Sequence, residues 1–168
     1  LYSEVNGNFP NHHPDPTDES TLKILLNKMK KVDADLGIAF DGDGDRIGVV
    51  DKLGRPIAGD LLTAFLANSI TTKDKKNQTI ILDIKSSYTA YDKIISLGFK
   101  AEIGKTGHSN IKKRIKEIKS PLAGEMSGHI FFGDTYFGYD DALYAAIRLL
   151  TLTANNIELD EFISTLPK

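Results

Sequence analysis

Three aspartates at alternate positions on a glycine-containing turn form the most informative segment of this 168-residue chain. They are Asp41, Asp43 and Asp45, and Arg46 follows directly. The glycines between them let the backbone turn tightly, so the three carboxylates can converge on one cation. Mg²⁺ prefers such oxygen ligands and usually keeps positions open for substrate phosphates. A guanidinium beside the metal is suited to bind phosphate oxygens. The segment therefore predicts a Mg²⁺ site that acts on a phosphorylated substrate.

The same spacing opens an EF-hand loop, which needs glycine at its sixth position and glutamate at its twelfth. Those positions hold Arg46 and Lys52. The flanking residues 36–40 and 47–50 are apolar and rich in branched side chains, which is typical of strands rather than helices. We therefore expect a loop between two strands, and an ordinary solvated turn is the remaining alternative.

The composition is that of an ordinary globular protein, with 40% hydrophobic and 26% charged residues. A net charge of −2 gives no indication of a nucleic-acid partner or of an acidic membrane surface. The sequence shows no signal peptide and no membrane-spanning stretch, so we expect a cytoplasmic location and no membrane partner. The chain begins at Leu1 rather than at a methionine, and we expect it to be a fragment.

Strands alternate with helices along the chain, which predicts an α/β fold with a mixed, mostly parallel sheet and flanking helices. Apolar periodicity predicts helices at 18–31, 61–69, 88–97, 110–118, 140–154 and 159–166, and strands at 79–84, 101–103, 122–124 and 129–132. Asp60 is expected to cap the second of these helices. The turn at residues 52–56 predicts a boundary between two domains, residues 1–54 and 55–168.

A second polar loop, Gly124-Glu125-Met126-Ser127-Gly128-His129, lies between two apolar runs. Ligands of open α/β sheets bind where loops leave the carboxyl ends of strands. Glu125 and Ser127 offer the acceptors and the donor that sugar hydroxyls need. His129 could move a proton near neutral pH. Taken alone the loop is weak evidence, because turns with two glycines are common.

The aspartate loop and the Gly-Glu-Met-Ser-Gly-His segment about 80 residues later together resemble the α-D-phosphohexomutase family, in its phosphomannomutase/phosphoglucomutase group. Residues 9–16, 83–85, 105–109 and 137–141 resemble further segments of that family in the same order. The resemblance implies that residues 1–54 are the end of its second domain, which carries the metal loop. Residues 55–168 would then be its third domain, which carries the sugar loop.

The resemblance also implies the site. Asp41, Asp43 and Asp45 would bind Mg²⁺, Glu125, Ser127 and Lys105 would bind substrate, and Arg46, His129, Lys85 and His108 would be catalytic. The implied partners are a hexose phosphate, a hexose 1,6-bisphosphate and the missing domains of the family. Alternatives remain: Arg46 as a structural ion pair with the aspartates, His129 as an ordinary loop residue, and Lys85 and His108 as ordinary surface residues.

The chain departs from the family in one large respect, because it has no Thr-x-Ser-His-Asn-Pro segment. The phosphoserine that donates the phosphoryl group is therefore missing, and Ser109 belongs to a different signature. We expect the isolated fragment to be inactive. Met126 favours the phosphomannomutase/phosphoglucomutase group over the glucosamine branch, while mannose and glucose both remain open as the sugar.

Two other functions fit parts of the pattern. A haloacid-dehalogenase-type phosphatase would use Asp41 as its nucleophile, but it expects threonine or valine where this chain has Asp45, and it leaves residues 125–129 without a role. A non-catalytic module that binds metal and phosphosugar is the other alternative.

Overall fold

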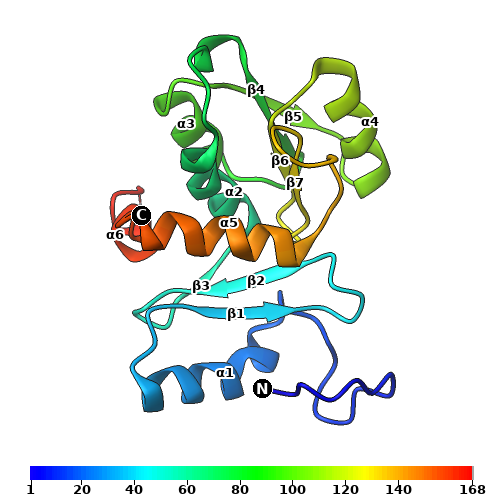
Figure 1. Cartoon of the computed structure of the whole chain (residues 1–168), viewed down its shortest axis with the longest axis vertical. Helices are drawn as coiled ribbons and strands as arrows, with labels where there is room; N and C mark the ends of the chain where they lie inside the picture. Colours follow the sequence, from blue (N-terminus) through cyan, green and yellow to red (C-terminus); the bar gives the residue numbers. More distant parts are fainter. Residues whose placement is uncertain (168) are drawn as a thin grey trace.

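The computed structural model describes residues 1–167. It has two β-sheets, of three and of four strands, which lie on either side of the helix α5 (Ala142–Ala154) (Figure 1). In the described residues no helix is both long enough and apolar enough to cross a membrane. The arrangement matters for function because α5 begins beside both polar loops.

The smaller sheet is antiparallel and carries the aspartate loop at one end. Its strands, in spatial order, are β1 (Gly37–Phe40), β2 (Ile47–Val50) and β3 (Pro56–Ile57). One face is covered by α1 (Glu19–Val32), whose buried Leu22 and Met29 pack with Val50. Asp18 caps α1 by accepting from the Ser20 N–H at 2.8 Å, so the predicted start of this helix is confirmed.

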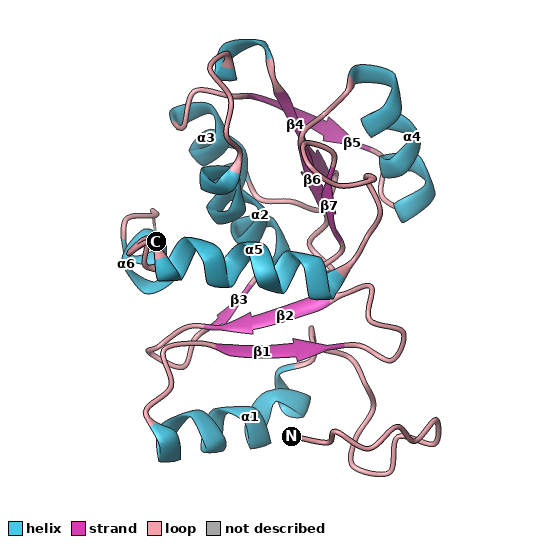
Figure 2. Cartoon of the chain, viewed as in Figure 1, coloured by secondary structure: helices cyan, strands magenta, loops and turns pink. Residues whose placement is uncertain are grey.

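The larger sheet confirms the predicted mixed, mostly parallel topology (Figure 2). Its strands, in spatial order, are β5 (Lys100–Gly104), β4 (Thr79–Asp83), β6 (Leu122–Gly124) and β7 (Ile130–Phe132). β5, β4 and β6 are parallel, and β7 is antiparallel to β6. The carboxyl ends of the three parallel strands therefore open on one edge of the sheet.

Helices cover both faces of this sheet, as its continuous apolar strands require. Ile80 and Leu82 point to the face under α2 (Gly59–Leu66), α3 (Tyr88–Ser96) and α5, while Ile81 points to α4 (His108–Ile118). α6 (Leu159–Ser164) packs on α2 through the rings of Phe162 and Phe65, whose centroids are 5.2 Å apart. Two short 3-10 helices, η1 (Ala67–Ser69) and η2 (Lys75–Asn77), lie between α2 and β4 along the chain.

The two sheets share one hydrophobic core. Ile47, Val49 and Ile57 of the small sheet belong to the same buried cluster as Leu62 of α2 and Leu149 of α5. β3 pairs with β2 although it lies beyond residue 54, the predicted domain boundary. The division into residues 1–54 and 55–168 therefore stays a prediction.

Two details of the sequence prediction need correction. Asp60 does not cap the helix that follows Pro56, because α2 begins after Ala58 and has no side-chain cap. Asp60 is instead buried, and its Oδ2 accepts the Ser87 N–H at 2.7 Å, which joins α2 to the start of α3. The sequence also predicts no strand at Pro56–Ile57, where the structure has β3. A strand of two residues that includes a proline has no apolar periodicity from which it could be predicted.

Candidate functional site: the metal loop and the sugar loop

The loop between β1 and β2, residues 41–46, is the predicted metal loop, called the metal loop below, and it is folded around the side chain of Asp41. The Asp41 Oδ1 atom accepts the backbone N–H groups of Gly44 at 3.0 Å and of Asp45 and Arg46 at 3.1 Å each. Gly44 has φ +76°, a conformation that glycine adopts without strain. One carboxylate therefore satisfies three donors that a tight turn would otherwise leave unpaired.

Asp41, Asp43 and Asp45 each place one carboxylate oxygen within 4.8 Å of the others. Octahedral coordination at about 2.0–2.1 Å sets neighbouring ligand oxygens about 3 Å apart and opposite ones about 4 Å apart. A small contraction of the loop would therefore bring the three oxygens into the coordination shell of one cation. The all-oxygen donor set suits a hard divalent ion.

The charges on the metal loop are unevenly compensated. Burial alone would raise the pKa of Asp41, but the side-chain hydrogen bond from Arg46 holds that pKa below its ordinary value. The pKa of Asp45 is raised by burial, by its contact with Asp41 and by the charges of Asp41 and Asp43, and the nearby His129 opposes this only in part. Bound cation would remove this repulsion, so the loop electrostatics fit a metal site.

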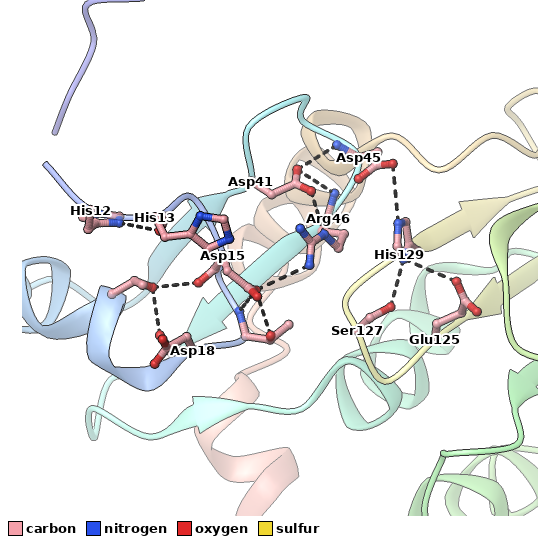
Figure 3. Close-up of polar contacts among 12 residues, drawn as sticks. His12, His13, Asp15, Asp18, Asp41, Asp45, Arg46, Glu125, Ser127 and His129 are labelled. Carbon is pink, nitrogen blue, oxygen red and sulfur yellow. Dashed lines mark hydrogen bonds and ion pairs between the residues drawn. The ribbon is translucent and has the colours of Figure 1, made fainter. Parts of the chain in front are cut away.

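Arg46 is held by two carboxylates. Its Nε donates to Asp41 Oδ2 at 2.6 Å, and its Nη1 lies 3.4 Å from Asp15 Oδ1 (Figure 3). Asp15 in turn accepts from the hydroxyl and the N–H of Thr17 at 2.8 and 3.0 Å, hydrogen bonds that lower its pKa. The structural ion pair that was one alternative for Arg46 is thus present. The catalytic role of Arg46 stays a prediction. Asp15 lies within the family-like segment 9–16, but no role was predicted for it, because a turn-rich segment does not indicate what an aspartate contacts.

The sugar loop, residues 124–129, connects β6 to β7 in a tight turn closed by the Glu125 N–H to His129 O bond of 3.0 Å. Glu125 is buried, and its Oε1 accepts the Gly107 N–H at 2.6 Å. Its Oε2 lies 3.3 Å from His129 Nδ1, and the Ser127 hydroxyl is 2.9 Å from the same nitrogen. The three predicted residues therefore form one hydrogen-bonded group.

The metal loop and the sugar loop are in direct contact. Arg46 and His129 form an antiparallel backbone bridge, and the Ile47 N–H donates to Gly128 O at 3.0 Å. The side chains meet as well, because His129 Nε2 is 3.4 Å from Asp45 Oδ2 (Figure 3). Residues that are about 80 positions apart in sequence thus lie in one site.

The other predicted site residues lie at the same edge of the larger sheet. Lys85 follows β4 and Lys105 follows β5, and both side chains are exposed. His108 is the first residue of α4, and its ring centroid is 6.4 Å from that of His129. The structure brings His108 to the site, whereas Lys85 and Lys105 are near it only through the strands they follow.

Asp83, at the end of β4, organises the loops around the site; it lies in the family-like segment 83–85, but no role was predicted for it. It is 1% exposed, and its Oδ1 accepts the Ser86 hydroxyl at 2.8 Å and the Met126 N–H at 3.3 Å. Its Oδ2 accepts the Thr106 hydroxyl at 3.1 Å. The sequence feature that could have indicated a role for Asp83 is its place at the end of a buried apolar strand, where ligand-binding loops begin.

An α/β sandwich with polar loops at the carboxyl ends of its strands, beside an acidic cation site, defines a class of ligand-binding α/β protein. Residues 58–168 match the family model described as "Phosphoglucomutase/phosphomannomutase, alpha/beta/alpha domain III", and residues 1–54 match the one described as domain II. The chain belongs to the phosphoglucomutase/phosphomannomutase family.

Individual relatives agree with this assignment. The chain is 47% identical over 156 residues to a phosphomannomutase/phosphoglucomutase of Pseudomonas aeruginosa, which covers 93% of this chain and 34% of that protein. It is 42% identical over 168 residues to a phosphoglucomutase of Neisseria gonorrhoeae, 36% of whose length is covered. A crystal structure of a family protein from Burkholderia thailandensis superimposes with a TM-score of 0.92 at 40% identity, over 100% of this chain and 36% of that one. The chain thus spans about a third of the length of these relatives.

Proposed function

We propose that this chain supplies the metal loop and the sugar loop of a phosphohexomutase, an enzyme of the isomerase class. That enzyme would interconvert hexose 6-phosphate and hexose 1-phosphate through a hexose 1,6-bisphosphate. The observation that carries the proposal is the backbone bridge between Arg46 and His129, because it joins a cation-binding loop to a sugar-binding loop. The names of the relatives support the reaction class.

In this proposal Asp41, Asp43 and Asp45 bind Mg²⁺ through one oxygen each. The ion would polarise the transferring phosphoryl group and screen its charge. Arg46 would stay anchored by Asp41 through Nε and by Asp15 through Nη1, and the N–H groups of its guanidinium that these carboxylates leave free would bind the substrate phosphate.

The sugar loop would orient the hexose and move its proton. Ser127 and Glu125 would bind the 3- and 4-hydroxyls of the sugar. These two hydroxyls occupy equivalent positions in either orientation of the bisphosphate, so the same contacts would serve both. His129 would accept the proton of the attacking hydroxyl, since its ring lies between this pair and the metal loop. Lys105, Lys85 and His108, at the same edge of the sheet, would bind the phosphate or the reacting end of the sugar.

The phosphoryl donor would come from a region outside this chain, since the predicted phosphoserine segment is absent from these 168 residues. We therefore expect the chain alone to bind glucose 1,6-bisphosphate in a Mg²⁺-dependent way and to show no turnover. Calorimetry with and without Mg²⁺ tests the first part, and a coupled mutase assay of the chain and of the full-length protein tests the second. Turnover by the isolated chain, or none by the full-length protein, would contradict the proposal.

The rival phosphatase reading gains no support from the geometry of Asp41. Its Oδ1 accepts three backbone N–H groups and its Oδ2 accepts from Arg46, so the carboxylate serves the folding of the loop in a way that a nucleophile does not require. An acid-stable phosphoserine in the full-length protein would favour the mutase, and a labile aspartyl phosphate on Asp41 the phosphatase. A non-catalytic binding module predicts binding without turnover even in the full-length protein.

Three further expectations belong to this proposal. The two domains would meet near residue 54, where the two matched family models also meet. The sugar is mannose, glucose or both, and kcat/KM for the two 1-phosphates measures the preference. The cytoplasmic location stays a prediction, to be tested by fractionation.

A further inference from the structure

The side chain of Asp140 is buried and only half satisfied. It is 6% exposed, and its Oδ1 accepts the Lys112 ammonium at 2.6 Å. Its Oδ2 is buried and has no hydrogen-bond partner among the described residues 1–167. A buried acceptor without a donor is destabilising, so this oxygen requires a partner that the side-chain positions in the structure do not supply.

Asp140 lies where the elements of the site meet. Its backbone forms an antiparallel bridge with Phe131 of β7, the strand that follows the sugar loop. Two residues later, the Ala142 N–H donates to Gly44 O of the metal loop at 3.1 Å. A carboxylate oxygen of Asp140 is also within 4.8 Å of ligand atoms of Asp45 and His129. The Asp140 carboxylate therefore lies within reach of groups of the site.

Two partners for Oδ2 are available, a cation or an imidazole. A cation shared with Asp45 and His129 is disfavoured, because the Lys112 ammonium already places a positive charge 2.6 Å from the same carboxylate. The imidazole of His108 is closer to what is needed, since its Nδ1 lies 3.8 Å from Oδ2. The His108 side chain is 56% exposed and free to rotate, and a shift of about 1 Å gives a hydrogen bond.

We propose that Asp140 is a positioning residue for His108, whose Nδ1–H it accepts through Oδ2. This bond places the lone pair of Nε2 on the opposite, exposed side of the ring, where it can accept a hydrogen bond from a sugar hydroxyl. Lys112 holds the carboxylate in the orientation that this requires. Carboxylates fix the tautomer and orientation of histidines in the same way in many sites. The catalytic consequence rests on the proposed function, whereas the tautomer does not.

The tautomer of His108 tests the geometry without any activity. Long-range ¹H–¹⁵N spectra of the chain at a pH where the ring is neutral should show His108 protonated on Nδ1, with the signal assigned by its loss in His108→Asn. Asp140→Asn should remove this preference. A neutral ring protonated on Nε2 in the unaltered chain overturns the proposal, and this result does not depend on whether Asp140→Asn folds.

The kinetic test uses the full-length protein. Asp140→Asn is expected to lower kcat/KM about 10–100-fold, the usual effect of removing a group that orients a site residue. Because Asp140 is proposed to act through His108, the double variant with His108→Asn should lose little more than His108→Asn alone. Losses that multiply overturn the proposal, since they show that the two residues act independently.

Asp141→Asn is the matched control. Asp141 is the adjacent carboxylate; it caps α5 by accepting the Tyr144 N–H at 2.8 Å and accepts the Tyr136 hydroxyl at 2.7 Å, and asparagine can fill the cap and donate its amide N–H to the Tyr136 oxygen. The kcat/KM of the Asp141→Asn protein should stay within about twofold of that of the unaltered full-length protein. If the unaltered full-length protein has no mutase activity but His108 carries its proton on Nδ1, the proposed function fails and the positioning geometry stands.

Discussion

His129 Nε2 lies 3.4 Å from Asp45 Oδ2, although the two residues lie in loops that connect strands of different sheets. Their loops are joined through the backbone as well, by the bridge between Arg46 and His129. Substitutions in the metal loop should therefore also alter the position or stability of the sugar loop.

Asp41→Asn and Asp45→Asn should change the stability of the metal-free chain in opposite directions. Asp41 is paired with Arg46 and its pKa is lowered, so its loss should reduce the free energy of unfolding by about 1–3 kcal/mol. Asp45 is repelled by Asp41 and Asp43 and its pKa is raised, so its loss should stabilise the chain by roughly 0.5 kcal/mol. Urea unfolding in chelator measures both values. Destabilisation of equal size in both variants would contradict the charge distribution described above.

The same two residues predict a pH dependence of the metal-free chain. The stabilisation from Asp41 is complete above the ordinary carboxyl pKa of 3.8 and is lost as the pH falls through its lower folded value. The penalty from Asp45 has the other sign and is relieved as the pH falls through its raised folded pKa. We therefore expect the difference in unfolding free energy between the unaltered chain and Asp45→Asn to shrink as the pH falls. This change should occur at a higher pH than the loss of the stabilisation from Asp41.

Asp43→Asn separates metal binding from folding. Asp43 is exposed, so the metal-free variant should keep its stability within about 0.5 kcal/mol. Mg²⁺ at ten times its Kd should stabilise the unaltered chain by about 1.4 kcal/mol, and the variant by much less at the same concentration. Thermal unfolding with and without Mg²⁺ gives both numbers. Asp74→Asn, in an exposed loop on the large sheet, serves as control and should respond to Mg²⁺ like the unaltered chain.

Gly128→Ala should break the contact between the two loops. Gly128 has φ +92°, and a Cβ there would lie 2.5 Å from Ile47 O, the carbonyl of the first β2 residue. Gly44→Ala is the matched control, because φ is +76° but nothing lies within 4 Å of its Cβ. The control should cost about 1–2 kcal/mol of backbone strain, and Gly128→Ala clearly more. Equal costs would mean that the sugar loop adjusts without moving β2.

Much of the architecture was accessible from the sequence. Apolar periodicity located the helices that flank the larger sheet, and the continuous run from Thr79 identified a strand buried on both faces. Asp41, Asp43 and Asp45 were recognisable because their chemistry is local to six residues. Their proximity to Glu125 and His129 was accessible only through the family resemblance, since it depends on packing between two sheets.

Some residues of the site had no predicted role because their contacts are distant in sequence. Asp83 and Asp140 lie in the family-like segments 83–85 and 137–141, and Lys112 lies in a predicted helix, but only tertiary packing shows which of them are buried and what they face. Asp60 was misread for the same reason, because an aspartate at a helix start normally serves as a cap. Its real partner, the Ser87 N–H, is 27 residues away.

The hydrogen bond from the Ile47 N–H to Gly128 O ties the start of β2 to the turn between β6 and β7, so the loops at residues 41–46 and 124–129 share one backbone support. Under the proposed function, a sugar bisphosphate that reoriented between two phosphoryl transfers would meet these two loops at a fixed separation. The movement that such a reorientation requires would then come from parts of the protein other than this pair of loops.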